Sequence, residues 1–136
     1  MSGALEAVLR QVGWQSQERV DVIEPGQVRR FCEAVGDPDP RWTHEAPPTF
    51  VVTLLTEPPQ LPEAYDYGSG WLNGGDRFEY RLPVRVGSSL RSQTTLTDVN
   101  EKRGRTGALL FLVFLTEFRT EDGELAVRHT GTRIRR

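Results

Sequence analysis

The sequence is poor in the residues that build cross-links and metal sites. It has one cysteine, Cys32, and two histidines, His44 and His129, among 136 residues. A single cysteine excludes an internal disulfide and a metal site made of cysteines. We therefore expect no metal, and a fold held together by an apolar core, for which a chain of this length is large enough.

Neither charge nor hydrophobicity is concentrated enough to indicate nucleic acid or a membrane as a partner. Lys and Arg number 17 against 19 Asp and Glu, a formal net charge of -2, so a basic nucleic-acid surface is not expected. The most apolar stretch, residues 47–57, is shorter than the roughly 20 residues that cross a bilayer. The first residues lack the basic and apolar regions of a signal peptide. These features predict one cytoplasmic domain spanning residues 1–136.

The stretch Pro47–Glu57, PPTFVVTLLTE, is predicted to be the central element of the fold. Prolines open it and Pro58-Pro59 follow it, which suits a helix, because proline is tolerated in the first turn and ends a helix that reaches it. Its side chains are apolar almost all round, which favours a buried helix. A strand is the alternative, since Val and Thr favour sheets and short apolar runs are ambiguous.

The chain before this stretch predicts a helix, a short strand and a second helix, at Ala4–Val12, Val20–Ile23 and Pro25–Val35. Gly36 ends the second helix. Cys32 lies on its apolar face, where we expect a small buried hydrophobic residue. Loops rich in turn residues are predicted at 37–46 and, over a longer span, at 58–75.

The second half of the chain predicts four antiparallel strands, at Phe78–Val86, Leu90–Val99, Ala108–Phe118 and Leu125–Ile134, with a charged hairpin loop at Asn100–Gly107. Phe78–Val86 alternates apolar and polar residues, so one of its faces is expected to be buried. Ala108–Phe118 is apolar on both faces and needs cover on each side. This second cover predicts a dimer. The closing arginines, Arg133, Arg135 and Arg136, are expected to be solvated.

Helices followed by a run of strands predict an α+β domain. A curved antiparallel sheet wrapped around one buried helix would satisfy the apolar stretch at 47–57 and the one-sided strand at 78–86.

Three stretches in this order resemble motifs of the MaoC-like dehydratases, specifically their N-terminal, hydratase-like half domain of the FAS1 type. Phe31–Pro40 is similar to the family's F-x-x-A-x-G-D-x-N-P, and Ala46–Phe50 to the A-P-P-T-F that opens its central helix. Leu72–Gly87 looks like its L-H-G-x-Q-x-F-x-Y-x-R-P-V-x-x-G strand. The resemblance implies the hot-dog fold, a curved antiparallel sheet around a central helix.

The resemblance also implies chemistry on acyl thioesters, the hydration of a trans-2-enoyl group or the dehydration of a 3-hydroxyacyl group. No cofactor is implied, because the substrate itself carries coenzyme A or the pantetheine of an acyl-carrier protein. Active members use an Asp and a His five residues later. A His can take a proton from water, and backbone N–H groups at the start of the central helix can hold the thioester oxygen.

The sequence departs from this pattern at the catalytic positions. Asp37 corresponds to the catalytic Asp, but Trp42 stands where the His is expected, and an indole N–H has no lone pair to accept a proton. Asp39 and His44 are also five residues apart and could form a displaced pair. Asn73 replaces a His that the family commonly has, and His129 is expected to be a structural sheet residue.

The helix start departs as well. Pro47 and Pro48 lack N–H donors, which leaves Thr49 and Phe50 to bind the thioester oxygen.

Our first hypothesis is therefore a non-catalytic subunit that pairs with a catalytic MaoC-like chain to form an (R)-specific enoyl-thioester hydratase or 3-hydroxyacyl-thioester dehydratase. Substrate contacts are then expected from Trp42, Thr49, Phe50, Leu54, Trp71, Asn73 and Gly74. A self-sufficient homodimer using Asp39 and His44 is a second hypothesis. A third is an acyl-thioester-binding or regulatory protein without catalysis. A thioesterase is disfavoured, because the central stretch offers only Glu57, at its far end.

Overall fold

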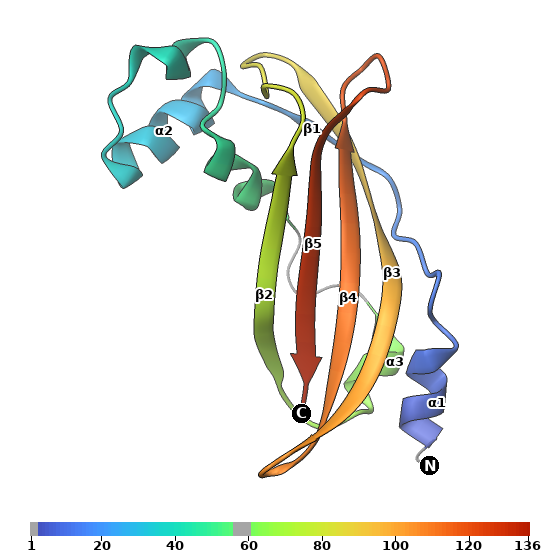
Figure 1. The fold of residues 1–136 in the computed structure, drawn as a ribbon. Helices are drawn as coiled ribbons and strands as arrows, with labels where there is room; N and C mark the ends of the chain where they lie inside the picture. Colours follow the sequence, from blue (N-terminus) through green and yellow to red (C-terminus); the bar gives the residue numbers. More distant parts are fainter. Residues whose placement is uncertain (1–2, 56–60) are drawn as a thin grey trace.

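Five antiparallel strands form one sheet in the computed structural model, which describes residues 3–55 and 61–136 (Figure 1). The strands are β1 (Arg19–Val22), β2 (Trp71–Tyr80), β3 (Ser89–Gly104), β4 (Gly107–Arg119) and β5 (Leu125–Arg135). They are arranged in the order β1-β3-β4-β5-β2, so β2 forms one edge. The predicted α+β class is confirmed.

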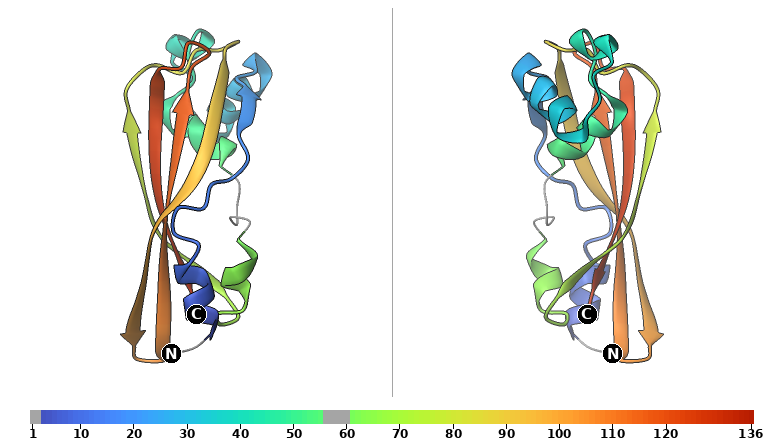
Figure 2. Two further views of the ribbon diagram at one scale, coloured as in Figure 1. Left: turned by 90° about the vertical axis from the view of Figure 1, so that its right-hand side faces the viewer. Right: turned by 90° about the vertical axis from the view of Figure 1, so that its left-hand side faces the viewer.

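All helices of the described residues lie on one face of this sheet, the inner face (Figure 2). They are α1 (Gly3–Leu9), α2 (Pro25–Val35), the 3₁₀ helices η1 (Pro40–Thr43) and η2 (Pro48–Leu54), and α3 (Pro62–Tyr65). α2 ends as its sequence predicts, because Gly36 adopts a left-handed conformation with φ 73°. No helix in these two described ranges is long and apolar enough to cross a membrane.

Two separate apolar clusters fill the space between the helices and the inner face. The first cluster lies under α2 and η2 and includes Val28, Cys32, Phe50, Leu54, Leu90, Phe118 and Val127. The second cluster lies under α1 and α3, at the other end of the strands, and includes Leu5, Val8, Ala64, Leu96, Leu112 and Phe114. Cys32 is thus buried, as predicted.

The central helix is shorter and differently wound than predicted. The stretch forms a seven-residue 3₁₀ helix, and Leu55 after it is extended (φ -76°, ψ 138°); Glu57, Pro58 and Pro59 lie outside the described residues. Val and Thr are poor helix formers, and the Thr53 hydroxyl donates to the Phe50 carbonyl oxygen at 2.8 Å. Val52 is half exposed, so the element buries one face and not its whole circumference.

The first long strand was also placed wrongly. β2 begins at Trp71, inside the predicted loop, and ends at Tyr80. Pro83 has no N–H to donate to a ladder, and beyond Tyr80 the chain returns to extended pairing only at the isolated bridge between Glu45 and Arg85. Val84 still reaches the first cluster. The alternation of apolar and polar residues at Phe78–Val86 therefore predicted burial correctly. The continuous strand that it also predicted is not formed.

The remaining boundaries differ less. α1 is shorter than Ala4–Val12, and β1 ends before Ile23. β3 continues through most of the predicted hairpin loop to Gly104, because its charged residues 101–103 are exposed to water within the strand.

β4 is covered unequally on its two faces. Its inner residues Leu110, Leu112, Phe114 and Phe118 are buried, whereas Leu109, Phe111, Val113 and Leu115 on the outer face are half-buried. None of the helices that the structure describes lies over that outer face (Figure 2). The second cover that the sequence demands is not provided by this chain's described residues, and the dimer stays a prediction.

The closing arginines were predicted to be solvated, and for two of them this prediction is wrong. Arg133 and Arg135 are buried, with 7% and 5% exposure. They occupy alternate positions on the inner face of β5, where Arg135 Nε donates to the Ala64 carbonyl oxygen and Nη2 to that of Tyr65, both at 2.9 Å. Its guanidinium carbon lies 5.3 Å from the Tyr65 ring centroid and 5.1 Å from that of Trp71. Arg135 therefore fastens the end of α3 to the sheet.

Replacement of this buried guanidinium should destabilise the fold strongly. Arg135→Met keeps the length of the side chain but leaves the carbonyl groups at the end of α3 without their donor, and should lower the free energy of unfolding by about 2–4 kcal/mol. Urea denaturation measures this. Arg105→Met, at an exposed turn position, is the control and should change stability by less than about 0.5 kcal/mol. Equal effects of the two substitutions would contradict the assigned role.

Candidate functional site

The residues that align with the family's catalytic loop lie beside α2 and in η1. Asp37 Oδ1 accepts a hydrogen bond from the Asp39 N–H at 3.1 Å. Asp39 caps η1 by accepting from the Arg41 N–H at 2.9 Å, and its carboxylate also pairs with the Arg41 guanidinium at 3.2 Å. Asp residues favour such local bonds at helix starts. Both carboxylates thus organise the loop itself.

Neither the Trp42 nor the His44 side chain hydrogen bonds to a carboxylate of this loop. The Trp42 ring packs against the first cluster, with the Arg41 guanidinium carbon 4.5 Å from its centroid. Its indole Nε1 is buried without a hydrogen-bond partner. His44 is exposed. Asp39 and His44, both within the described ranges, do not hydrogen bond to each other, so the pair suggested by their spacing is not formed in this chain.

A hollow of about 520 Å³ lies beside this loop, with Asp37, Asp39 and Trp42 among its walls. It is separate from the start of η2. There Thr49 is exposed, and the Phe50 N–H already donates to the Pro47 carbonyl oxygen at 2.9 Å. One of the two donors left after the prolines is therefore already engaged.

The other predicted substrate contacts are spread over the molecule. Phe50 is buried in the first cluster, where its ring lies edge-on to that of Phe31 with the ring centroids 5.6 Å apart. Trp71 packs at the second cluster, far along the strands. Gly74 lies on β2, where an added Cβ would come within 2.9 Å of the Thr132 methyl group. Of this group only Leu54 borders a second cavity, which lies on the inner face.

That cavity, of about 470 Å³, lies between the two apolar clusters. Its apolar walls are Trp14, Leu54, Leu55 and Phe114. Its size falls in the range of small-molecule sites, about 300–1,000 Å³.

A row of polar side chains crosses the sheet at the cavity. Strand pairing places Thr94 opposite Thr116 and Thr116 opposite His129. The two threonine hydroxyl oxygens are 2.7 Å apart. Thr116 and His129 are 6% and 4% exposed, so the inner face is polar between the two apolar clusters.

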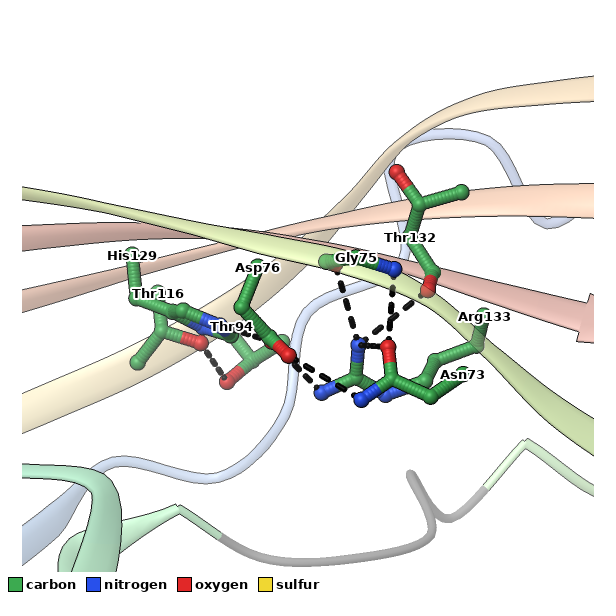
Figure 3. Close-up of polar contacts among 8 residues, drawn as sticks. All are labelled: Asn73, Gly75, Asp76, Thr94, Thr116, His129, Thr132 and Arg133. Atoms are coloured by element: carbon green, nitrogen blue, oxygen red, sulfur yellow. Dashed lines mark hydrogen bonds and ion pairs between the residues drawn. The ribbon is translucent and has the colours of Figure 1, made fainter.

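His129 belongs to an ionic network with Asp76 and Arg133 (Figure 3). His129 Nε2 lies 2.6 Å from Asp76 Oδ1, and Arg133 Nη2 donates to the same oxygen at 2.9 Å. Asn73 donates to Asp76 Oδ2 at 3.1 Å and accepts from Arg133 Nη1 at 3.2 Å. Asn73, expected at a substrate site, is thus a member of this network.

The network fixes the charge of Asp76. Burial acts to raise the pKa of this carboxyl, but hydrogen bonds from His129, Asn73 and Arg133 outweigh burial and lower the pKa to about 2. A carboxylate only accepts, so Nε2 of His129 carries the proton of their bond. His129 Nδ1 is buried and has no partner. His129 is a sheet residue, as expected, but one ring nitrogen remains unsatisfied.

The sequence contains a signal for this network. The prediction that the last arginines are solvated did not take it into account. His129, Gly131, Arg133 and Arg135 occupy every second position of β5 and therefore share its inner face. A histidine and two arginines on the buried face of a strand require acidic or carbonyl partners. Asp76, directly across from Gly131, could not be paired with them until the register was known.

The described residues contain no group of three or more His, Cys, Asp or Glu side chains that could hold a metal ion.

Acid should reveal the contribution of Asp76 to stability. Its pKa is depressed in the folded state, so its stabilisation is complete above about pH 4 and is lost as pH falls toward 2. After discounting for partial exposure, the loss is about 1–2 kcal/mol. Asp76→Asn should be less stable at pH 7, and its stability should fall less between pH 5 and pH 2.5 in urea titrations. Parallel pH profiles would contradict the depressed pKa.

Comparison with known proteins places this architecture in a class. The chain superposes on one chain of the ChsH1-ChsH2 complex from Mycobacterium tuberculosis with a TM-score of 0.81 at 18% identity, covering 97% of this chain and 90% of that chain. It matches one chain of a C-terminally truncated HadBC (3R-hydroxyacyl-ACP dehydratase) complex from the same organism with a TM-score of 0.70 at 23% identity. That match covers 89% of this chain and 93% of the other. An (R)-hydratase from A. caviae matches with a TM-score of 0.68 at 19% identity, covering 90% of this chain and 94% of the other. The fold is the hot-dog fold of MaoC-like dehydratases.

Sequence comparison gives the family. Residues 10–129 match the model described as FAS1-like, dehydratase domain region, and the chain belongs to this family. A UPF0336 protein from Streptomyces avermitilis is 32% identical over 111 residues, 66% of this chain and 72% of that protein. Another from Thermobifida fusca is 29% identical over 120 residues, 74% of each.

Proposed function

We propose that this chain is the non-catalytic subunit of an (R)-specific enoyl-thioester hydratase or 3-hydroxyacyl-thioester dehydratase, and that it shapes the acyl site of a catalytic MaoC-like partner. The observation that carries the proposal is Trp42, which occupies the position of the family's base and packs into the first cluster. Its indole nitrogen cannot accept a proton.

The neighbouring groups do not replace that base. Asp39 is engaged by Arg41, and His44 is exposed to solvent. A general base must lie within about 3 Å of the proton that it removes and needs a group that orients it. The loop therefore supports a structural role in this chain, and the Asp and His come from the partner.

Two features of the molecule favour a partner. β2 is an edge strand of ten residues, and such an edge presents N–H and C=O groups to another chain. The outer face of β4 carries half-buried apolar side chains. Two of the similar structures, ChsH1-ChsH2 and HadBC, are described as complexes.

The substrate in this proposal is an acyl thioester whose carrier is coenzyme A or an acyl-carrier protein, in the cytoplasm. No cofactor takes part, because addition of water to an enoyl thioester needs only proton transfer and stabilisation of the thioester oxygen.

The experiment is to measure crotonyl-CoA hydration by the purified chain, by a candidate MaoC-like chain with an intact G-D-x-N-P-x-H encoded nearby, and by the two together. The lone chain should be inactive and the mixture active. Asp37→Asn and His44→Ala in this chain should leave activity of the complex within about twofold. Loss of the partner's histidine should cost at least about 100-fold, as removal of a general base does.

Robust hydration by the lone protein would overturn the proposal. The homodimer hypothesis then predicts that His44→Ala abolishes turnover without lowering the melting temperature. If neither chain, alone or mixed, turns over the thioester while acyl-CoA binding is measurable by calorimetry, a binding or regulatory protein is the better description.

A further inference from the structure

The inner-face cavity is distinct from the loop that corresponds to the family's catalytic motif. Its walls come from residues 14–19, from the end of η2 and from β3, β4 and β5. The hollow beside Asp37 and Trp42 has no wall residue in common with it. The cavity therefore needs an explanation of its own.

Size and apolar walls suit an acyl group. A volume of about 470 Å³ has room for about fifteen groups of the size of a water molecule, at roughly 30 Å³ each. Trp14, Leu54, Leu55 and Phe114 give it apolar sides, and displacement of water from such walls favours binding of hydrocarbon.

The middle of the cavity is polar, which a plain hydrocarbon chain would not match. The Thr94 and Thr116 hydroxyl oxygens, 2.7 Å apart, form one hydrogen bond, which uses the hydrogen of one of the two hydroxyl groups. Two hydroxyl groups carry two hydrogens, so the pair retains one O–H that can donate elsewhere. Both residues line the cavity. Covering a donor with hydrocarbon costs about 1–3 kcal/mol.

The charged residues at the cavity are already neutralised. Arg133 pairs with Asp76 at 2.9 Å, and Arg19 pairs with Asp21 at 3.1 Å while also donating to the Leu54 carbonyl oxygen at 3.2 Å. A second carboxylate or phosphate would have to displace one of these partners. The cavity therefore suits an uncharged acceptor.

Gly131 gives the cavity its depth beside this polar row. An added Cβ at Gly131 would lie 2.8 Å from His129 Cε1 and 3.1 Å from Arg133 Nη1. The absence of a side chain there lets both residues fold down against the sheet, which keeps the space above them open.

We propose that this cavity binds an acyl group that carries a neutral oxygen substituent, a hydroxyl or a ketone, part-way along its apolar body. The oxygen accepts the remaining hydrogen of the Thr94–Thr116 pair, and the hydrocarbon on either side contacts Trp14, Leu54, Leu55 and Phe114. That the acyl group is presented as a thioester rests on the proposed function; the preference for an oxygen substituent rests on the cavity alone.

Direct binding tests this preference without catalysis. The probes are the dodecanoyl thioester of N-acetylcysteamine and a series in which a hydroxyl or keto oxygen is moved along the middle of the chain. Titration calorimetry is performed on the purified chain and on its complex with a partner. At least one oxygenated thioester should bind about tenfold more tightly than the plain one, the equivalent of one hydrogen bond.

Thr94→Val combined with Thr116→Val removes both hydroxyl groups, and should remove this preference and leave the affinity for the plain thioester nearly unchanged. Thr130→Val is the matched control, because Thr130 lies on the outer face of β5, and it should keep the preference. A cavity-filling change, Leu55→Trp, should weaken binding of every probe by at least about tenfold. Val52→Trp, on the half-exposed side of η2, should not. Circular dichroism and melting temperatures verify that each variant is folded.

Equal affinity for plain and oxygenated thioesters, an unchanged preference in the Thr94→Val/Thr116→Val double variant, or binding of no probe by either the chain or the complex would each overturn the inference. Hydratase activity of the complex together with such a result would reject the inference and keep the proposed function. Selective binding by a complex that performs no hydration would do the opposite.

Discussion

The need to cover the inner face of a long sheet with a short central helix governs this structure. The thirteen residues of β4 extend over about 44 Å at roughly 3.4 Å each, whereas the seven residues of η2 cover about 14 Å at roughly 2.0 Å each. One end of the sheet therefore packs against α2 and η2, and the other requires α1 and α3. The interval between them is left as a cavity, and polar residues of β3, β4 and β5 line it.

Polar groups at that interval are stabilised by one another. The Asp76 carboxylate accepts from His129, Arg133 and Asn73, which compensates the cost of placing two cationic or titratable side chains on a buried face. Arg135 solves the same problem differently, by donating to backbone carbonyl groups. The polar residues of the loop at Asp37–His44 and those of the inner face consequently form two separate groups.

The parts of the fold that sequence patterns predicted well are those governed by local periodicity. β4 and β5 followed from apolar density and short turns, and α2 from its Pro25 start and Gly36 end. A helix at η2 was predicted, but its 3₁₀ winding was not, because Val and Thr side chains and the Thr53 hydroxyl change the balance between helix types by energies too small to be seen in a burial pattern. The end of β2 was misplaced, because pairing with β5 stops at Tyr80 whereas Val84 is still buried. The partners of Asp76 depend on register across strands far apart in sequence, which no local pattern contains.

The two edges of the sheet differ in a way that limits how the protein can assemble. Gly13 and Ser16 donate to Leu96 and Thr94, and β1 pairs with the start of β3, so that half of the β3 edge is occupied; its other half carries the charged run 101–103, which discourages strand addition. β2 is the longer of the two edge strands, with ten residues against the four of β1. Strand addition through β2 alone would terminate after two chains, since a two-fold axis uses the β2 edge of each chain. The short N-terminal segment beside β3 occupies backbone groups to which a further strand could otherwise add.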